Sequence, residues 1–121
     1  MTQATQTYGK VANQIASSRE IEADLLLGAA AQLQTIHDGW EAKHSELNAA
    51  LLHNRKLWSL LLTSVTRPEN PLPANVRQNV ANIGIFVLKQ TMTTIADPRP
   101  ENLGSLISIN RELAAGLLGR A

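Results

Sequence analysis

The sequence predicts an all-α fold: a four-helix bundle-like single domain with a flexible or short-helical N-terminal arm. Apolar residues recur three and four positions apart in four long segments, the spacing of one face of an α-helix. Prolines cluster at 67–73 and 97–100, where they end helices and form turns. No segment alternates apolar and polar residues as a half-buried strand does. We place the arm at 1–16 and the helical domain at 17–121, because 121 residues suffice for one core.

The first helix is expected to begin near Ser17. Ser17 and Glu20 match a capping box, in which each side chain bonds the other residue's free backbone amide. Gly39 suggests the end of this helix or a break in it. The predicted apolar stripe consists of Ile21, Leu25, Ala29, Leu33, Ile36 and Trp40.

Three further helices are predicted at about 43–65, 73–96 and 103–118. Extra leucines widen the apolar surface of the second helix, so this helix is either central in the bundle or shared with a partner. Gly84 lies in the middle of the third helix, where glycine costs about 1 kcal/mol relative to alanine. Close approach of another helix explains that glycine better than flexibility does. Asn102 is the expected cap of the last helix and Gly119 its expected end.

Two asparagines interrupt otherwise apolar stripes, in the phrases Asn54-Arg55-Lys56-Leu57 and Asn110-Arg111-Glu112-Leu113. A covered amide must be hydrogen-bonded, so it more often fixes register or contacts a partner than drives collapse. The two amides either pair inside the bundle, or they line a groove for an amphipathic helix with the adjacent arginines at its rim. Trp58 is likewise either a core residue or a partner anchor.

Composition excludes several functions. Net charge is +1 and there is no cysteine, so disulfides and thiolate metal sites are excluded. The longest apolar run, 25–31, is too short for a membrane span of about 20 residues, and 1–14 contain no signal-peptide core. We therefore expect a soluble, cytoplasmic protein that does not bind membranes.

The sequence gives no sign of catalysis, of a cofactor or of a metal site. No two of the three histidines, His37, His44 and His53, are four residues apart. There is no nucleophile elbow and no glycine-rich phosphate loop. Basic residues near 55 and 111 could contact RNA phosphates, but the aromatic residues fall on or near the helix stripes, and solvated charge is the stronger interpretation.

The order of several short phrases resembles the bacterial flagellar regulator family FlaF. These are Asn54-x-x-Leu57-Trp58-x-x-Leu61, Asn70-Pro71-Leu72-Pro73, the block 83–87, and Leu106-Ile107-x-Ile109-Asn110-Arg111. The resemblance covers about 47–118, and Phe86 stands where tryptophan is expected at least as often. It implies a non-catalytic protein required for flagellin synthesis and export, a flagellin-binding secretion chaperone acting alongside the regulator FlbT. Direct binding of flagellin mRNA, or a scaffold that only couples FlbT to other flagellar components, are the alternatives.

The four predicted helices carry more apolar surface than they can bury against one another. We expect the remaining apolar surface to bind a partner. The predicted partner-binding residues, around which a flagellin helix would be held, are Asn54, Arg55, Trp58, Asn110 and Arg111. When no client is present, the same groove could be covered by the apolar positions of the arm, Tyr8, Val11 and Ile15.

Overall fold

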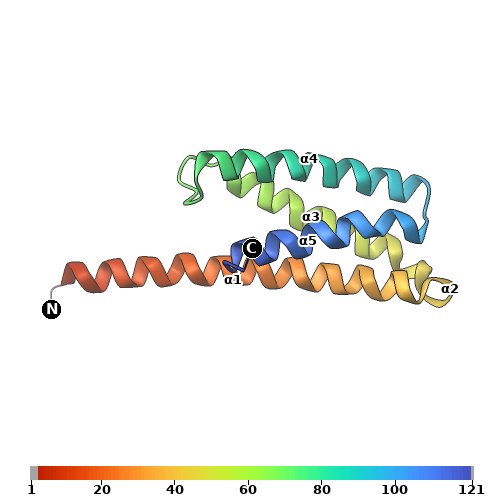
Figure 1. Cartoon of the computed structure of the whole chain (residues 1–121), viewed down its shortest axis with the longest axis horizontal. Coiled ribbons are helices and arrows are strands. Elements are labelled where there is room, and N and C mark those ends of the chain that lie inside the picture. The colour runs from red at the N-terminus through yellow and green to blue at the C-terminus, as the bar shows by residue number, and fades with distance from the viewer. Residues whose placement is uncertain (1–2, 121) are drawn as a thin grey trace.

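A computed structural model describes residues 3–120, with side chains from Ser18 onward. Within that range every regular element is helical, and the all-α, four-helix prediction is confirmed (Figure 1). The four long helices are α1 (Gln3–Asp38), α3 (Leu47–Val65), α4 (Ala74–Ala96) and α5 (Gly104–Leu117). Short segments connect them: α2 (Trp40–Lys43), η1 (His44–Glu46) and η2 (Pro100–Leu103).

Helix α1 differs from its prediction in its start and in its buried face. Helical backbone runs from Gln3 through Ser17, so the predicted helix start at Ser17 is wrong. The N-terminal end of α1 projects beyond the other helices (Figure 1). The side chains of the predicted arm, including Tyr8, Val11 and Ile15, lie outside the described residues, and the boundary between 1–16 and 17–121 stays a prediction.

The first two residues of the predicted α1 stripe do not enter the core. Ile21 and Leu25 are 60% and 47% exposed, whereas Ala23 and Leu26 are fully buried. Three consecutive leucines at 25–27 permit more than one helical stripe, and sequence spacing alone cannot choose between them. The stripe that the other helices cover is Ala23, Leu26, Ala29, Ala30, Leu33 and Ile36.

The turn between α1 and α3 begins at Gly39, as predicted. The Gly39 backbone N–H bonds the Thr35 carbonyl at 3.1 Å, and the chain then reverses through α2 and η1. The Trp40 and His44 rings stack with centroids 5.7 Å apart. Helix α3 therefore starts at Leu47, four residues later than predicted.

Helices α3 and α4 form an antiparallel pair. Their loop is held by Asn70, whose amide donates to the Ser64 carbonyl at 3.1 Å and whose Oδ1 accepts from the Leu72 N–H at 3.0 Å. A Cβ at Gly84 would lie 2.5 Å from Leu62 Cδ2, so the predicted close helix approach at this glycine is confirmed.

Helix α5 follows a turn at 97–100 and lies against α1. Asn102 does not cap α5 through its side chain, because it lies within η2 and donates its amide to the Asp97 carbonyl at 2.9 Å. The helix ends as predicted, with Gly119 at a positive φ of 72° that favours glycine. In the resulting bundle α3 contacts both α1 and α4, whereas α4 packs chiefly on α3.

Candidate binding site: a buried amide network and an open groove

The two in-stripe asparagines contact each other in the centre of the bundle. Asn110 Nδ2 donates to Asn54 Oδ1 at 2.7 Å and to the Leu26 carbonyl at 3.3 Å. Trp58 Nε1 donates to Asn110 Oδ1 at 2.8 Å. All three polar side chains are fully buried, so the network joins α1, α3 and α5 through atoms that water does not reach.

The donor and acceptor pattern fixes the orientation of both amides. An indole N–H can only donate, so the atom of Asn110 facing Trp58 must be its oxygen. The Asn110 nitrogen then faces two oxygens, those of Asn54 and of the Leu26 carbonyl. This leaves Asn54 Nδ2 buried without a hydrogen-bond partner. Asn110 is therefore the centre of the network and Asn54 its incompletely satisfied end.

Of the two alternatives for the asparagines, pairing inside the bundle is confirmed. A groove lined by these amides would require exposed side chains, and Asn54, Trp58 and Asn110 have no exposed surface. The core alternative for Trp58 is confirmed as well. A partner cannot reach these three residues without opening the bundle.

Arg55 and Arg111 are exposed, and binding by them stays a prediction. Arg111 carries positive charge toward α1: it is a minor cause of the lowered pKa of Asp38, after hydrogen bonds from His37 and Gln34. The Asp38 side chain is itself exposed, so this charge pattern belongs to a solvated surface.

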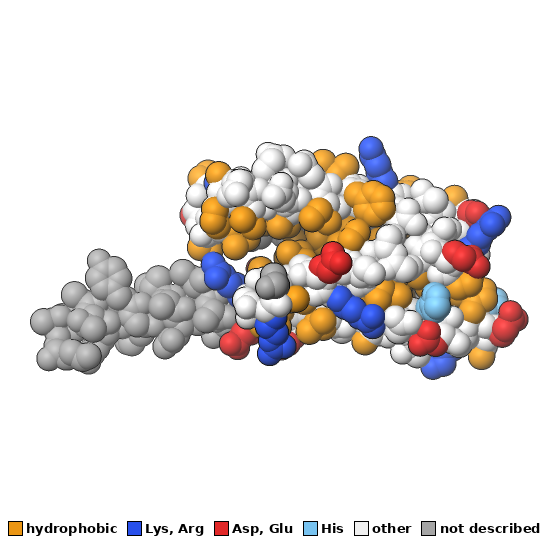
Figure 2. Space-filling view, in the orientation of Figure 1, with side chains coloured by type: hydrophobic (Ala, Val, Ile, Leu, Met, Phe, Trp, Pro, Cys, Tyr) orange, Lys and Arg blue, Asp and Glu red, His pale blue; other side chains and the backbone are white. Residues whose placement is uncertain are grey.

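The predicted surplus of apolar surface is present. Many large apolar side chains of the described region are at least a third exposed: Ile21, Leu25, Leu27, Leu52, Leu60, Val76, Ile83, Ile85, Phe86, Met92 and Ile95. More than half of them belong to α4, because this helix packs on α3 and leaves both of its flanks largely uncovered. Hydrophobic side chains gather along the seam between α4 and α5 (Figure 2).

This seam is an open apolar groove that widens toward one end of the molecule. At its closed end Gln90 Nε2 of α4 donates to the Asn102 carbonyl at 3.1 Å. From there α5 leans away from α4 toward α1 (Figure 1). We define the α4–α5 groove by Val76 and Val80 on α4 and by Leu113 and Leu117 on α5, which line a pocket between the two helices. Helical spacing extends each side by one turn, to Ile83 three positions after Val80 and to Ile109 four positions before Leu113.

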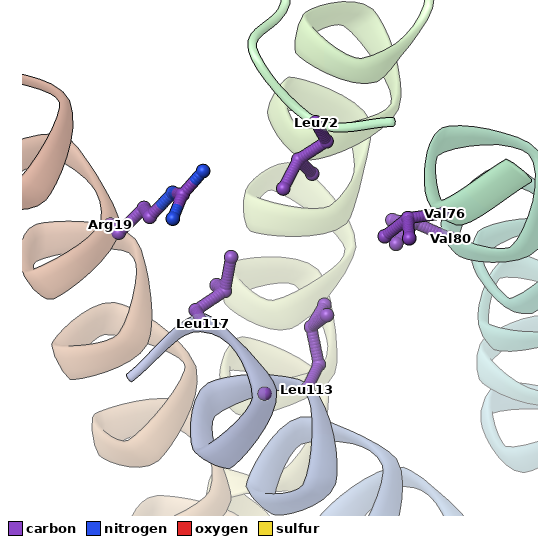
Figure 3. A pocket seen from close by; sticks show the side chains of 7 residues that line it. Arg19, Leu72, Val76, Val80, Leu113 and Leu117 are labelled. Atoms are coloured by element: carbon purple, nitrogen blue, oxygen red, sulfur yellow. The ribbon is translucent and has the colours of Figure 1, made fainter. Parts of the chain in front are cut away.

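A pocket of about 150 Å³ forms the wide end of the groove. It is lined by Arg19 of α1, Leu72 of the α3–α4 loop, Val76 and Val80 of α4, and Leu113, Gly116 and Leu117 of α5 (Figure 3). We call it the Arg19 pocket. Its walls are aliphatic, and among the side chains that the structure describes Arg19 is the one charged residue that lines it.

Two acid–base groups of α1 set the charge near this pocket. Arg19 Nε is buried and has no hydrogen-bond partner among the residues from Ser18 onward. One helical turn later, partial burial raises the pKa of the Glu22 carboxyl, and the positive charge of Arg19 opposes that rise. The pocket thus combines an apolar interior with a cation whose hydrogen-bonding capacity is incompletely used.

The other flank of α4 carries a second apolar row without a pocket. Ile85, Met92 and Ile95 are exposed there, and we call them the outer row. Ile83 and Ile85 lie two positions apart, which places them on different flanks of one helix. They are 40% and 52% exposed, so they form a closely matched pair for testing the two surfaces.

Sequence reasoning did not identify the Arg19 pocket. Val76, Leu113 and Leu117 lie on stripes that predict core residues, and nothing in their spacing indicates that α4 and α5 diverge. The available signal was the number of apolar positions on the third helix, which exceeds what one neighbouring helix can cover. The sequence could not indicate that Arg19 lies on the inner face of α1, because the predicted apolar stripe of that helix was wrong at its first two positions.

Within the described part of the chain no three metal-ligating side chains cluster together. Nor does any helix there reach the length and apolar character that crossing a membrane requires.

Fold and groove together define a small helical-bundle protein with an open apolar groove on one face. The chain belongs to the FlaF family: the family model described as flagellar protein FlaF matches residues 4–117, nearly the whole length. Searches of curated proteins and of solved structures returned no match.

Proposed function

We propose that this FlaF-family protein is a cytoplasmic secretion chaperone that binds flagellin without catalysis and regulates flagellin synthesis and export together with FlbT. Family membership supports a flagellar role. The observation that carries the binding step is the open α4–α5 groove, an apolar channel that ends in a pocket between two helices.

The groove suits an amphipathic helix. Such a helix presents anchors at i, i+3, i+4 and i+7, and it binds by burying them in a complementary apolar cleft. Ile83 and Leu113 supply apolar surface on opposite sides of the groove, on α4 and α5. Export requires a flagellin that has not assembled, and covering its apolar helical segments would keep those segments from aggregating.

The proposed flagellin contact lies in the α4–α5 groove and not at the buried residues Asn54, Trp58 and Asn110. Because Trp58 is fully buried, Trp58→Ala would report on stability rather than on binding. Binding has to be tested at exposed residues of the groove, and Ile83 is suited because it is part of the groove and only partly covered.

The test is titration of purified flagellin monomer with the wild type, Ile83→Glu and Ile85→Glu, in the absence of RNA. Ile83→Glu should weaken binding by about tenfold or more, which corresponds to about 1.4 kcal/mol, because a charge replaces an apolar contact in the groove. Ile85→Glu makes the same change on the outer row and should leave the affinity unchanged. Circular dichroism and urea unfolding must show both variants folded.

Other results would contradict the proposal. Equal loss in both variants, or loss only in Ile85→Glu, would place the contact outside the groove. Binding of the flagellin transcript leader with a steep salt dependence, and none of flagellin, would favour direct mRNA regulation. Binding of FlbT alone would favour a scaffold.

A further inference from the structure

The Arg19 side chain points from α1 into the wide end of the groove, toward the space between Leu72 and Leu117 (Figure 3). Its Nε is buried and finds no hydrogen-bond partner in the described part of the chain. Among the residues that the structure describes, no carboxylate lies within ion-pair distance of this guanidinium. A buried donor of a charged group is costly to leave unsatisfied, so the site favours a ligand that brings an acceptor.

The pocket below the guanidinium fits one apolar side chain. A cavity of about 150 Å³ with aliphatic walls holds a molecule of roughly benzene size. Leu72, Val76, Leu113 and Leu117 bound it, and none of them offers a side-chain hydrogen bond to a polar ligand group. The ligand group that enters must therefore be apolar, while its acceptor stays at the rim beside Arg19.

An apolar residue at the end of a peptide satisfies both requirements at once. Its side chain can fill the pocket while its α-carboxylate, attached to the same Cα, reaches the guanidinium. A helix also concentrates negative partial charge at its C-terminus, which favours a nearby cation. An aspartate or glutamate side chain would instead need a separate apolar neighbour at the correct spacing.

We infer that the Arg19 pocket receives the C-terminal apolar residue of the bound helix, with the free α-carboxylate of that residue paired to Arg19. This inference rests on the proposed function and specifies the end of the client that the groove recognises. It also sets a direction: the client's chain end lies at the pocket, so the client runs parallel to α5 and antiparallel to α4.

Glu22 lies one helical turn from Arg19 and opposes this binding. Its carboxylate is near enough for the two charges to interact, yet the pair does not close to ion-pair distance. A client carboxylate would meet the same negative charge. Removing it with Glu22→Gln should therefore tighten binding of a free-acid client.

The experiment compares two forms of one peptide by fluorescence anisotropy. The probe is the last ~20 residues of flagellin, a length that spans about 30 Å as a helix, made as the free acid and as the C-terminal amide. The free acid should bind the wild type about fivefold more tightly, the upper range for an ion pair near a protein surface. In Arg19→Gln the two forms should bind equally.

The results separate this inference from the function on which it rests. If acid and amide bind the wild type equally while Ile83→Glu still abolishes flagellin binding, the carboxylate assignment is wrong and the groove assignment stands. If only a peptide from the other end of flagellin binds, the assignment of the chain end is wrong. If wild-type protein does not bind flagellin, the proposed function fails.

Gly116 allows the pocket to be blocked without disturbing the fold. A Cβ at Gly116 meets no atom within 4 Å, and this residue lines the pocket. Gly116→Leu should fill the pocket and weaken binding of the free-acid peptide at least tenfold. Gly28 is an equally unobstructed helical glycine on α1 outside the pocket lining, so Gly28→Leu is the matched control and should bind as the wild type does. Equal binding by both variants would overturn the pocket assignment.

Discussion

Asn110 of α5 donates its amide to Asn54 Oδ1 of α3 across 2.7 Å, in a core from which water is excluded. The two residues do not contribute equally, because Asn110 also accepts from Trp58 and donates to the Leu26 carbonyl. Asn54 makes this one side-chain bond and leaves its own amide nitrogen unpaired. The network should therefore tolerate the loss of Asn54 much better than the loss of Asn110.

Substitution of each asparagine by leucine should expose this asymmetry. Asn110→Leu leaves Trp58 Nε1 and Asn54 Oδ1 buried without partners, at a cost of about 3 kcal/mol. Asn54→Leu removes one acceptor but also an orphaned donor, and Asn110 keeps the Leu26 carbonyl, so its cost should stay within about 1 kcal/mol. Urea unfolding of both variants measures the difference, and equal losses of stability would contradict the assigned network.

Trp58 should be coupled energetically to Asn110. Trp58→Phe keeps an aromatic ring but removes the indole donor, which leaves Asn110 Oδ1 unpaired and costs about 2 kcal/mol. In an Asn110→Leu background that acceptor is already absent, so the same change should cost at least about 1 kcal/mol less. The coupling energy from a double-mutant cycle checks this. Additive effects would show that the hydrogen bond contributes nothing.

The sequence predicts helices better than it predicts which of their faces are covered. Helical spacing, proline turns and Gly39 locate the four long helices to within a few residues at most boundaries, because these signals are local. The stripe on α1 was wrong at Ile21 and Leu25, since a run of three leucines allows alternative stripes and only the neighbouring helices select one. Pairing of Asn54 with Asn110 was one of two predicted outcomes, and tertiary contact decided between them.

The α4–α5 groove could not be predicted from the spacing of apolar residues along the sequence. Residues such as Leu113 and Val76 obey the same periodicity whether a helix faces another helix or an opening. The divergence of α4 from α5 depends on where the 97–100 turn and the Gln90–Asn102 contact hold them together, which is a property of the whole fold. Local pattern therefore predicted an apolar surplus without its position.

Glu22 predicts a pH-dependent difference in stability. Burial raises the pKa of its carboxyl in the folded protein, so folding disfavours the ionised form, and this penalty develops as pH rises above the ordinary value of 4.5. Glu22→Gln should therefore be more stable than the wild type at neutral pH, by at most about 0.5 kcal/mol because solvent screens this half-exposed group. At pH 3, well below the ordinary value of 4.5, the Glu22 carboxyl is almost fully protonated in both the folded and the unfolded state, and the difference should vanish.

Chemical unfolding of Glu22→Gln and wild type between pH 3 and pH 7, in steps of about one unit, measures this trend. Glu20→Gln, at an exposed glutamate of the same helix, controls for the helix propensity of glutamine. A gain of stability in Glu22→Gln that grows as pH falls would contradict the sign of the effect.

The effect of Gly84→Ala on the free energy of unfolding should change sign when Leu62 is shortened to alanine. In the wild type, Gly84→Ala places its Cβ 2.5 Å from Leu62 Cδ2 and 2.9 Å from Leu62 Cγ, so the branched end of the leucine must shift. Overpacking costs about 1–3 kcal/mol, against a gain of about 1 kcal/mol in helix propensity, and the net change should be a loss of about 1 kcal/mol.

Shortening Leu62 removes the overpacking cost of Gly84→Ala and keeps its gain in helix propensity. In a Leu62→Ala background the new methyl group has space, so Gly84→Ala should stabilise the protein by about 0.5–1 kcal/mol. Free energies of unfolding for the four proteins of this cycle give the comparison directly. If Gly84→Ala destabilises equally in both backgrounds, α3 and α4 are not held together through this contact. The glycine would then require another explanation than close helix packing.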